Sequence, residues 1–134
     1  TEAAVNKLAL MLAERGIRDI RMFDVSRTHL SDIVGEVWEN SHLVIASPTY
    51  NMHLYAGAAN LLEDLLALGL KNRKVAIIGN HSWASAAKKS MEELVSSLKD
   101  SEILASMDIK SSLKDEQLVE LEAMADAIAN SMTV

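Results

Sequence analysis

The sequence contains no cysteine, only one proline, and no apolar run long enough to cross a membrane. The absence of cysteine excludes disulfide bonds, iron–sulfur clusters and thiol chemistry. A membrane-spanning helix needs roughly 18 or more consecutive apolar residues, and no stretch of the sequence reaches that length. No signal peptide is visible either. These absences favour a cytoplasmic location and argue against the membrane as a partner.

Basic residues are the minority among the charged side chains. There are 13 lysines and arginines against 19 aspartates and glutamates, a formal net charge of −6. This balance argues against nucleic acid as a partner. The four histidines are scattered and none has the spacing of metal ligands, so we expect no metal site. They are His29, His42, His53 and His81.

The chain does contain enough apolar material for one packed domain. It has 134 residues, of which 49% are hydrophobic. A domain of this size buries roughly 68% of the surface that its extended chain exposes. We therefore predict a single folded domain over residues 1–134 rather than a disordered chain.

Hydrophobic periodicity divides the chain into alternating helices and strands. Apolar residues recur at helical spacing in five stretches, and short runs rich in β-branched residues lie between them. The strand at 17–25 alternates only partly, which is typical of an edge strand with one wetter side. The predicted helices are 2–15, 31–39, 54–68, 86–99 and 115–131, and the predicted strands are 17–25, 43–46, 74–79 and 103–109, the last of them weak.

This alternation predicts an α/β fold, a three-layer, doubly wound parallel sheet with helices on both faces. Such a sheet normally starts with a strand that lies near its centre, whereas this chain opens on a helix. Without that strand, the strand at 17–25 has no neighbour and backbone groups stay unpaired in the interior. We therefore expect an upstream strand and its loop, before Thr1, in the natural protein.

The sequence HLVIASPTYN, residues 42–51, combines a buried strand with a polar loop. Pro48 most simply ends the strand. In open parallel sheets, ligands lie outside the carboxyl ends of the strands. The loop 47–53 is therefore the first candidate for a site, and the loop 79–85, after the next buried strand, is the second.

These two loops resemble those of a known family. SPTYN at 47–51 and GNHSW at 79–83 are similar to loops of the flavodoxin-like domain of flavodiiron proteins, also called A-type flavoproteins. LSDIV at 30–34 and the final helix fit the same family, and Thr1 is similar to the end of its phosphate-binding loop. The likeness extends over nearly the whole chain and implies a flavodoxin-like fold.

The resemblance implies an FMN site built from three loops. The first loop would hold the phosphate at a helix N-terminus, and only its last residue is present in this sequence. The second loop would line one side of the isoalloxazine ring, and the third would cover the other side and bind the pyrimidine edge. The residues implied to bind the cofactor are Thr1, Ser47, Pro48, Thr49, Tyr50, Asn51, Met52, Gly79, Asn80, His81, Ser82 and Trp83.

The resemblance also implies a function and partners. In the family this domain transfers electrons, and a separate upstream domain holds a di-iron centre that reduces oxygen or nitric oxide. The implied partners are that di-iron domain, an electron donor such as a rubredoxin or a reductase, and a second copy in a homodimer. FMN carries the redox chemistry, so no residue of this chain is predicted to act as an acid, base or nucleophile.

Both loops depart from the family pattern at glycine positions. His53 stands where the family has glycine after Asn-Asn, and Ser82 and Ser85 stand where it has glycine on either side of Trp-Ser. Glycine allows positive φ and close approach of the backbone to a ligand. Since most of the phosphate loop is also absent, we expect this chain alone to bind FMN weakly or not at all.

The sequence leaves alternatives open. A degenerate flavodoxin-like module without flavin could serve packing or dimerisation, and a free-standing NAD(P)H-dependent FMN reductase is a weaker hypothesis because no nicotinamide motif is present. Ser47 and Thr49 could bind a ligand or cap the next helix. Tyr50 and Trp83 could stack on a flat ring or cover the apolar edge of the sheet.

Overall fold

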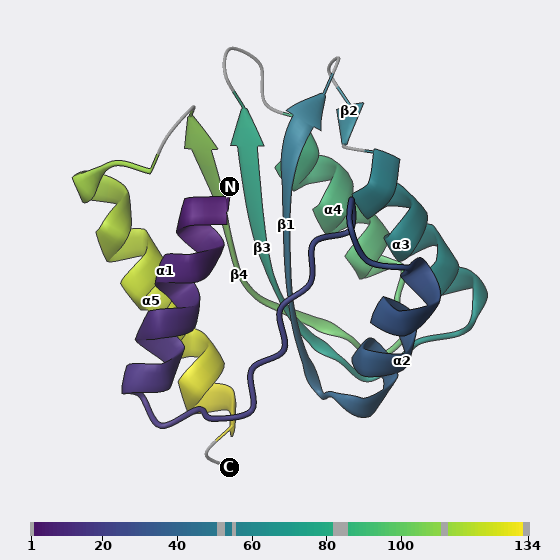
Figure 1. Ribbon diagram of the computed structural model, residues 1–134, viewed down its shortest axis with the longest axis horizontal. Helices are drawn as coiled ribbons and strands as arrows, with labels where there is room; N and C mark the ends of the chain where they lie inside the picture. The colour runs from purple at the N-terminus through teal and green to yellow at the C-terminus, as the bar shows by residue number, and fades with distance from the viewer. Residues whose placement is uncertain (1, 51–52, 55, 82–85, 111–112, 133–134) are drawn as a thin grey trace.

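The computed structural model describes residues 2–50, 53–54, 56–81, 86–110 and 113–132. Helices and strands alternate along these residues (Figure 1). The helices are α1 (Glu2–Glu14), α2 (Leu30–Glu39), α3 (Ala56–Ala67), α4 (Ala87–Ser96) and α5 (Asp115–Met132). The strands are β1 (His42–Tyr50), β2 (His53–Leu54), β3 (Lys74–His81) and β4 (Glu102–Lys110).

The strands form one sheet in the order β2-β1-β3-β4. β1, β3 and β4 run parallel, and the two-residue β2 pairs antiparallel with the end of β1. β3 lies between two partners and is buried from Val75 to Asn80. A strand that is covered on both faces needs no polar side, which explains the nearly continuous apolar run in β3.

Helices cover both faces of the sheet and give three layers (Figure 1). α1 and α5 pack against one face, where they share a core with Ala76 and Ile78 of β3. α2, α3 and α4 cover the other face, where they share a core with Val75 and Ile77. Alternate residues of β3 thus enter opposite cores, as the two-residue period of a strand requires. The predicted α/β fold with a parallel sheet between two helix layers is confirmed.

The predicted strand at 17–25 is wrong. Residues 17–24 have no regular secondary structure, and they run along β1 without pairing with it (Figure 1). An alternating sequence becomes a strand only where a neighbouring strand completes its hydrogen bonds. No described strand lies between this segment and β1, so its backbone has no ladder to join.

The prediction that Pro48 ends the strand is also wrong, because β1 continues to Tyr50. The Lys74 amide donates to the Ser41 carbonyl oxygen at 3.0 Å, so the backbone polar groups of Ser41 point toward β3. These groups alternate in direction along a strand, and the Pro48 nitrogen therefore points away from β3. Proline is tolerated in a strand at such a position because the ladder needs no N–H there.

The other predicted helices and strands are confirmed, with ends shifted by a few residues. The weak strand predicted at 103–109 forms β4, and its pairing with β3 shifts register between Val75 and Ala76. None of the described helices combines the length and the apolar character that crossing a membrane requires.

Candidate functional site at the carboxyl ends of the strands

The stems of the two predicted loops lie next to each other. Ser47 of β1 is opposite Gly79 of β3, and Pro48 is opposite Asn80. Both strands point the same way, so the loops that follow them leave from one edge of the sheet. The structure therefore brings together the two regions that the sequence singled out.

The Thr49 hydroxyl caps a helix. Its Oγ1 accepts hydrogen bonds from the backbone amides of Ala86 at 3.2 Å and Ala87 at 3.0 Å. These amides begin α4, whose own N-cap residue, Ala86, offers no side-chain acceptor. Thr49 does cap a helix, as one interpretation held, but that helix is α4 rather than α3, the next along the chain. Because both of its lone pairs are used, the hydroxyl has only its proton to offer a ligand.

Ser47 is buried, with 1% of its surface exposed. Its hydroxyl donates to the Pro48 carbonyl oxygen at 3.0 Å. A hydroxyl in this position is satisfied by its own backbone, which keeps a buried polar group from being unpaired. The structure thus gives Ser47 a local role at the end of β1.

Gly79 allows α4 to approach β3 closely. A Cβ atom placed on Gly79 would lie 2.9 Å from both the backbone nitrogen and the Cβ of Lys88. Real Cβ atoms do not approach backbone that closely, so any other residue would push the first turn of α4 away. This glycine therefore fixes the distance between helix and sheet, as the Thr49 cap fixes where the helix begins.

His81 at the end of β3 pairs with an acidic residue that sequence reasoning missed. Its Nδ1 lies 3.1 Å from Oδ1 of Asp108 on β4, and both side chains are largely buried. The Asp108 backbone carbonyl also accepts a hydrogen bond from the Gln117 side chain at 3.1 Å. The sequence contains one signal for this pair. Asp108 lies near the end of the predicted strand 103–109, and that strand pairs in the sheet with the strand that ends at His81. Because Nδ1 of His81 contacts Asp108, Nε2 is the ring nitrogen that can contact a ligand.

Some predicted site residues lie outside the described part of the chain. These are Thr1, Asn51, Met52, Ser82 and Trp83. Tyr50 is described as the last residue of β1. Stacking of Tyr50 and Trp83 on a common ring therefore stays a prediction.

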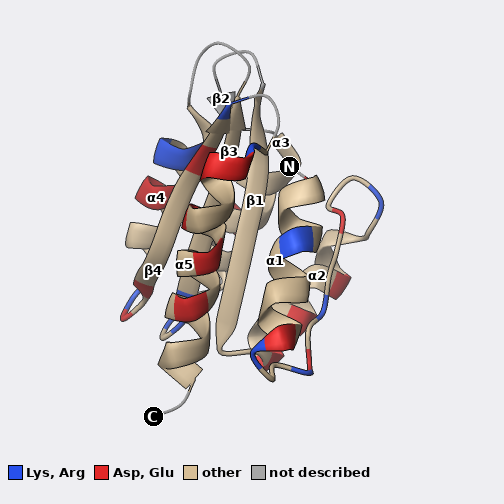
Figure 2. Ribbon diagram, turned by 90° about the vertical axis from the view of Figure 1, so that its left-hand side faces the viewer, with Lys and Arg blue, Asp and Glu red and all other residues tan. Residues whose placement is uncertain are grey.

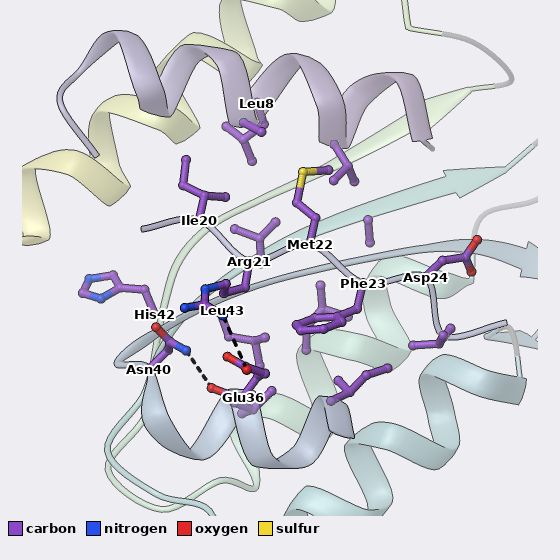
Figure 3. A pocket seen from close by; sticks show the side chains of 18 of the residues that line it. Leu8, Ile20, Arg21, Met22, Phe23, Asp24, Glu36, Asn40, His42 and Leu43 are labelled. Atoms are coloured by element: carbon purple, nitrogen blue, oxygen red, sulfur yellow. Dashed lines mark hydrogen bonds and ion pairs between the residues drawn. The ribbon is translucent and has the colours of Figure 1, made fainter. Parts of the chain in front are cut away.

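A large groove runs along β1 and was not predicted as a site. It encloses about 640 Å³, is mainly apolar, and lies between β1, α1, α2 and the segment 17–26 (Figure 3). Ser47 and Pro48 line its carboxyl end, so it opens beside the candidate site. His42 lines the groove near the start of β1, where burial and the Lys74 charge lower the pKa of its imidazole.

Metal ligands do not gather in the described residues. No group of three or more histidine and acidic side chains there could hold an ion. The arrangement at the carboxyl ends offers instead a proline surface, a hydroxyl proton and an imidazole nitrogen, which are groups that can contact an organic ligand.

Comparisons with known proteins bear on this site. No protein-family model matches the chain. An anaerobic nitric oxide reductase flavorubredoxin from Shigella flexneri is 24% identical over 118 residues, which are 87% of this chain and 24% of the relative. The chain thus spans about a quarter of the length of this curated relative.

Solved structures share the fold. The rubredoxin oxygen:oxidoreductase of Desulfovibrio gigas superposes with a TM-score of 0.89 at 21% identity, over 98% of this chain and 32% of that protein. The flavodiiron protein of Giardia intestinalis gives a TM-score of 0.81 at 14% identity, over 97% of this chain and 33% of its own. Flavodoxin 1 of Bacillus cereus gives 0.82 at 12% identity, over 98% and 90%. The chain therefore has the flavodoxin-like fold, and its predicted resemblance to the flavodoxin-like domain of flavodiiron proteins is confirmed.

Proposed function

We propose that this chain is the flavin-carrying electron-transfer domain of a flavodiiron-type oxidoreductase, with FMN at the carboxyl ends of β1 and β3. One observation carries the proposal: the two loop stems singled out by their sequence leave from adjacent parallel strands at one edge of the sheet. The fold shared with the Desulfovibrio gigas oxidoreductase supports it.

The described residues at this edge offer apolar and polar groups that can contact a flavin ring. Pro48 is exposed and presents an apolar surface, while Thr49 and His81 are half-buried beside it in the sheet. The Thr49 proton and Nε2 of His81 are polar groups of the kind that a heteroaromatic edge requires. Residues 51–52 and 82–85 would complete the contacts with the ring, as the family resemblance implies.

The chain's own residues would bind and orient the cofactor rather than react with substrate. When bound, FMN would supply the electron transfer. The Asp108 carboxylate holds Nδ1 of His81, so the imidazole is oriented before any ligand arrives. The Thr49 cap and the contact between Gly79 and Lys88 hold α4 at a fixed place beside the loop stems.

The remaining parts of the proposal concern the longer protein. The Shigella relative is a nitric oxide reductase and the Desulfovibrio protein is an oxygen oxidoreductase. We propose that the acceptor is likewise nitric oxide or oxygen, reduced at a di-iron centre in another domain. Electrons would come from a rubredoxin or a reductase, and a homodimer would bring the flavin close to that centre.

Flavin binding is tested with the purified chain. Quenching of flavin fluorescence would be followed on titration with FMN and, separately, with riboflavin, which lacks the phosphate. We expect weak FMN uptake or none by the chain alone, and saturable uptake when an upstream strand and phosphate loop are added. In the extended chain, His81→Gln should weaken FMN binding, and His29→Gln, on the surface loop before α2, should leave it unchanged. A chain that takes up neither flavin, alone or with an added upstream strand, would contradict the proposal and support a packing module without cofactor.

A further inference from the structure

His81 and Asp108 lie on the face of the sheet that α4 covers. Val75 and Ile77 of β3 pack in the core beneath α4. Because side chains alternate along a strand with a period of two, Gly79 and His81 lie on the same face. Asp108 is opposite Gly79 in the register of β3 and β4, so it shares that face. β1 and β3 contain no acidic residue, whereas β4 does (Figure 2), and Asp108 thus brings a carboxylate to the carboxyl ends of the strands.

The Asp108 carboxylate determines which ring nitrogen of His81 carries the proton. Its Oδ1 lies 3.1 Å from Nδ1 of His81. A carboxylate has only lone pairs to offer, so Nδ1 has to donate the hydrogen bond. A neutral imidazole has one donor nitrogen and one acceptor nitrogen. Nε2 of the neutral ring is therefore an acceptor, and its lone pair points away from Asp108.

The fold holds this pair in place from the side of the carboxylate. The side chains of His81 and Asp108 are 17% and 21% exposed, which limits the space in which the ring can turn. Gln117, in the first turn of α5, donates to the Asp108 backbone carbonyl oxygen at 3.1 Å. The pairing of β3 with β4 sets the separation of the two residues. A carboxylate that is fixed on one strand thus orients an imidazole on the next strand.

Thr49 supplies the opposite hydrogen-bonding polarity from the other neighbour of β3. Its Oγ1 accepts the amides of Ala86 and Ala87, so its proton is what it can offer to a ligand. Those amides lie at the start of α4, so the Thr49 side chain is on the same face of the sheet as His81. β1 and β3 are paired, and paired strands lie about 4.8 Å apart. Two neighbouring strands therefore present one donor and one acceptor on one face.

We propose that Asp108 is a positioning residue that makes His81 a hydrogen-bond acceptor, so that this edge selects a ligand with an N–H group beside a carbonyl group. The ligand carbonyl would accept from Thr49, and the ligand N–H would donate to Nε2 of His81. An imide has this pattern, and the pyrimidine edge of FMN is an imide, so the choice of FMN rests on the proposed function. A site built to accept from an N–H group discriminates against an analogue that lacks it, because its own acceptor is then left unpaired.

Nitrogen NMR of the histidine rings tests the position of the proton in the chain without flavin. At a pH at which the rings are neutral, we expect His81 to carry its proton on Nδ1. His29, on the surface loop before α2, should favour Nε2, as histidine does in water. Asp108→Leu removes the acceptor at a similar side-chain size and should move the His81 proton to Nε2. Asp108→Asn keeps an oxygen that can accept from Nδ1, so in this matched control the proton should stay.

Flavin analogues test the selection in the chain extended by an upstream strand and phosphate loop. FMN methylated at N3 lacks the imide N–H, whereas 5-deaza-FMN keeps it and should bind like FMN. His81→Phe keeps a flat ring and removes the acceptor. We expect the loss of affinity on methylation to be about tenfold larger in the native extended chain than in His81→Phe, because only the native chain loses a hydrogen bond. Asp108→Leu should reduce this difference as well, and circular dichroism would check that each variant is folded.

Two results would overturn the proposal. A proton on Nε2 of His81 in the native chain, or one on Nδ1 that Asp108→Leu leaves in place, would show that Asp108 does not position the ring. An equal effect of methylation in the native extended chain and in His81→Phe would show that His81 does not select the imide. A chain that binds FMN with the proton on Nε2 would retain the proposed function and reject the role of Asp108. A chain that binds no flavin would reject the proposed function and the imide ligand, while NMR still decides whether Asp108 positions His81.

Discussion

Replacing Thr49 by valine removes a hydroxyl while keeping the shape of the side chain and its preference for strands. In the native structure this hydroxyl accepts the amides of Ala86 and Ala87 across 37 and 38 residues of sequence. Valine would leave both amides without their acceptor at the start of α4. Thr49→Ser keeps the acceptor and serves as the matched control.

The loss can be sized from the geometry. Removing a side-chain cap costs typically about 1 kcal/mol, and a part-buried amide left unpaired adds to that, so we expect Thr49→Val to lower the free energy of unfolding by about 1–2 kcal/mol. For a domain of this size that corresponds to a fall of roughly 3–8 °C in the melting temperature. Thr49→Ser should retain most of the stability.

Urea unfolding followed by circular dichroism measures the difference, and amide exchange at Ala86 and Ala87 localises it. Exchange at these two amides should accelerate in Thr49→Val, while exchange in β3 follows only the global stability. If Thr49→Val is as stable as Thr49→Ser and both amides stay protected, the hydroxyl does not hold α4. A contact of Thr49 with FMN, as the family resemblance implies, would then explain better why this position carries a hydroxyl.

Three further predictions concern packing and charge. Gly79→Ala would place its Cβ 2.9 Å from the Lys88 backbone nitrogen. Chemical unfolding should therefore show that the free energy of unfolding falls by about 1–3 kcal/mol. An unchanged unfolding midpoint would refute the close contact. The folded pKa of His42 is lowered by burial and then by Lys74, so stability from the neutral imidazole is fully present above pH 6.5 and is lost as the pH falls below it. Urea titrations between pH 7 and 5.5 should show this loss in the native chain and a smaller one in His42→Gln, and equal losses would contradict it. Arg15, just after α1, forms ion pairs with Asp126 and Glu122 of α5, and these carboxylates raise the pKa of its guanidinium. Arg15→Gln should therefore lower the melting temperature, and the decrease should be smaller at high salt. The same decrease at all salt concentrations would exclude an ionic contribution.

Hydrophobic periodicity was enough to predict the helices and strands whose own residues show the spacing of that structure. β3 and the five helices show apolar residues at the spacing of the structure they adopt, and they pack as predicted. The segment 17–25 failed because a strand is defined by its neighbour, which no property of its own residues can supply. Pro48 failed because its effect depends on which way its nitrogen points, and that direction is set by the pairing of Ser41 with Lys74.

The adjacency of the two candidate loops was predictable, but the contacts around their stems were not. Its place followed from the rule that parallel strands present their loops at one edge, and the register of Ser47 with Gly79 agrees. The hydrogen-bond partners of Thr49 and His81 come from the start of α4 and from β4, which are distant in sequence. No local sequence motif therefore indicates these contacts. Both contacts depend on how α4 docks and how the strands align, which only the folded molecule defines.

In the described part of the chain, no strand pairs with the edge of β1 at Val44 and Ala46 that faces away from β3, and this open edge has a consequence for how the protein behaves at high concentration. Unpaired amides and carbonyls on an uncharged, apolar strand are a template for pairing with any extended chain, including the same edge of another molecule. The net charge of −6 opposes such encounters, and its effect weakens as salt screens it. Solubility should therefore fall with added salt and with approach to the isoelectric point near 5.1, and fibrillar aggregates are the form in which the chain would leave solution.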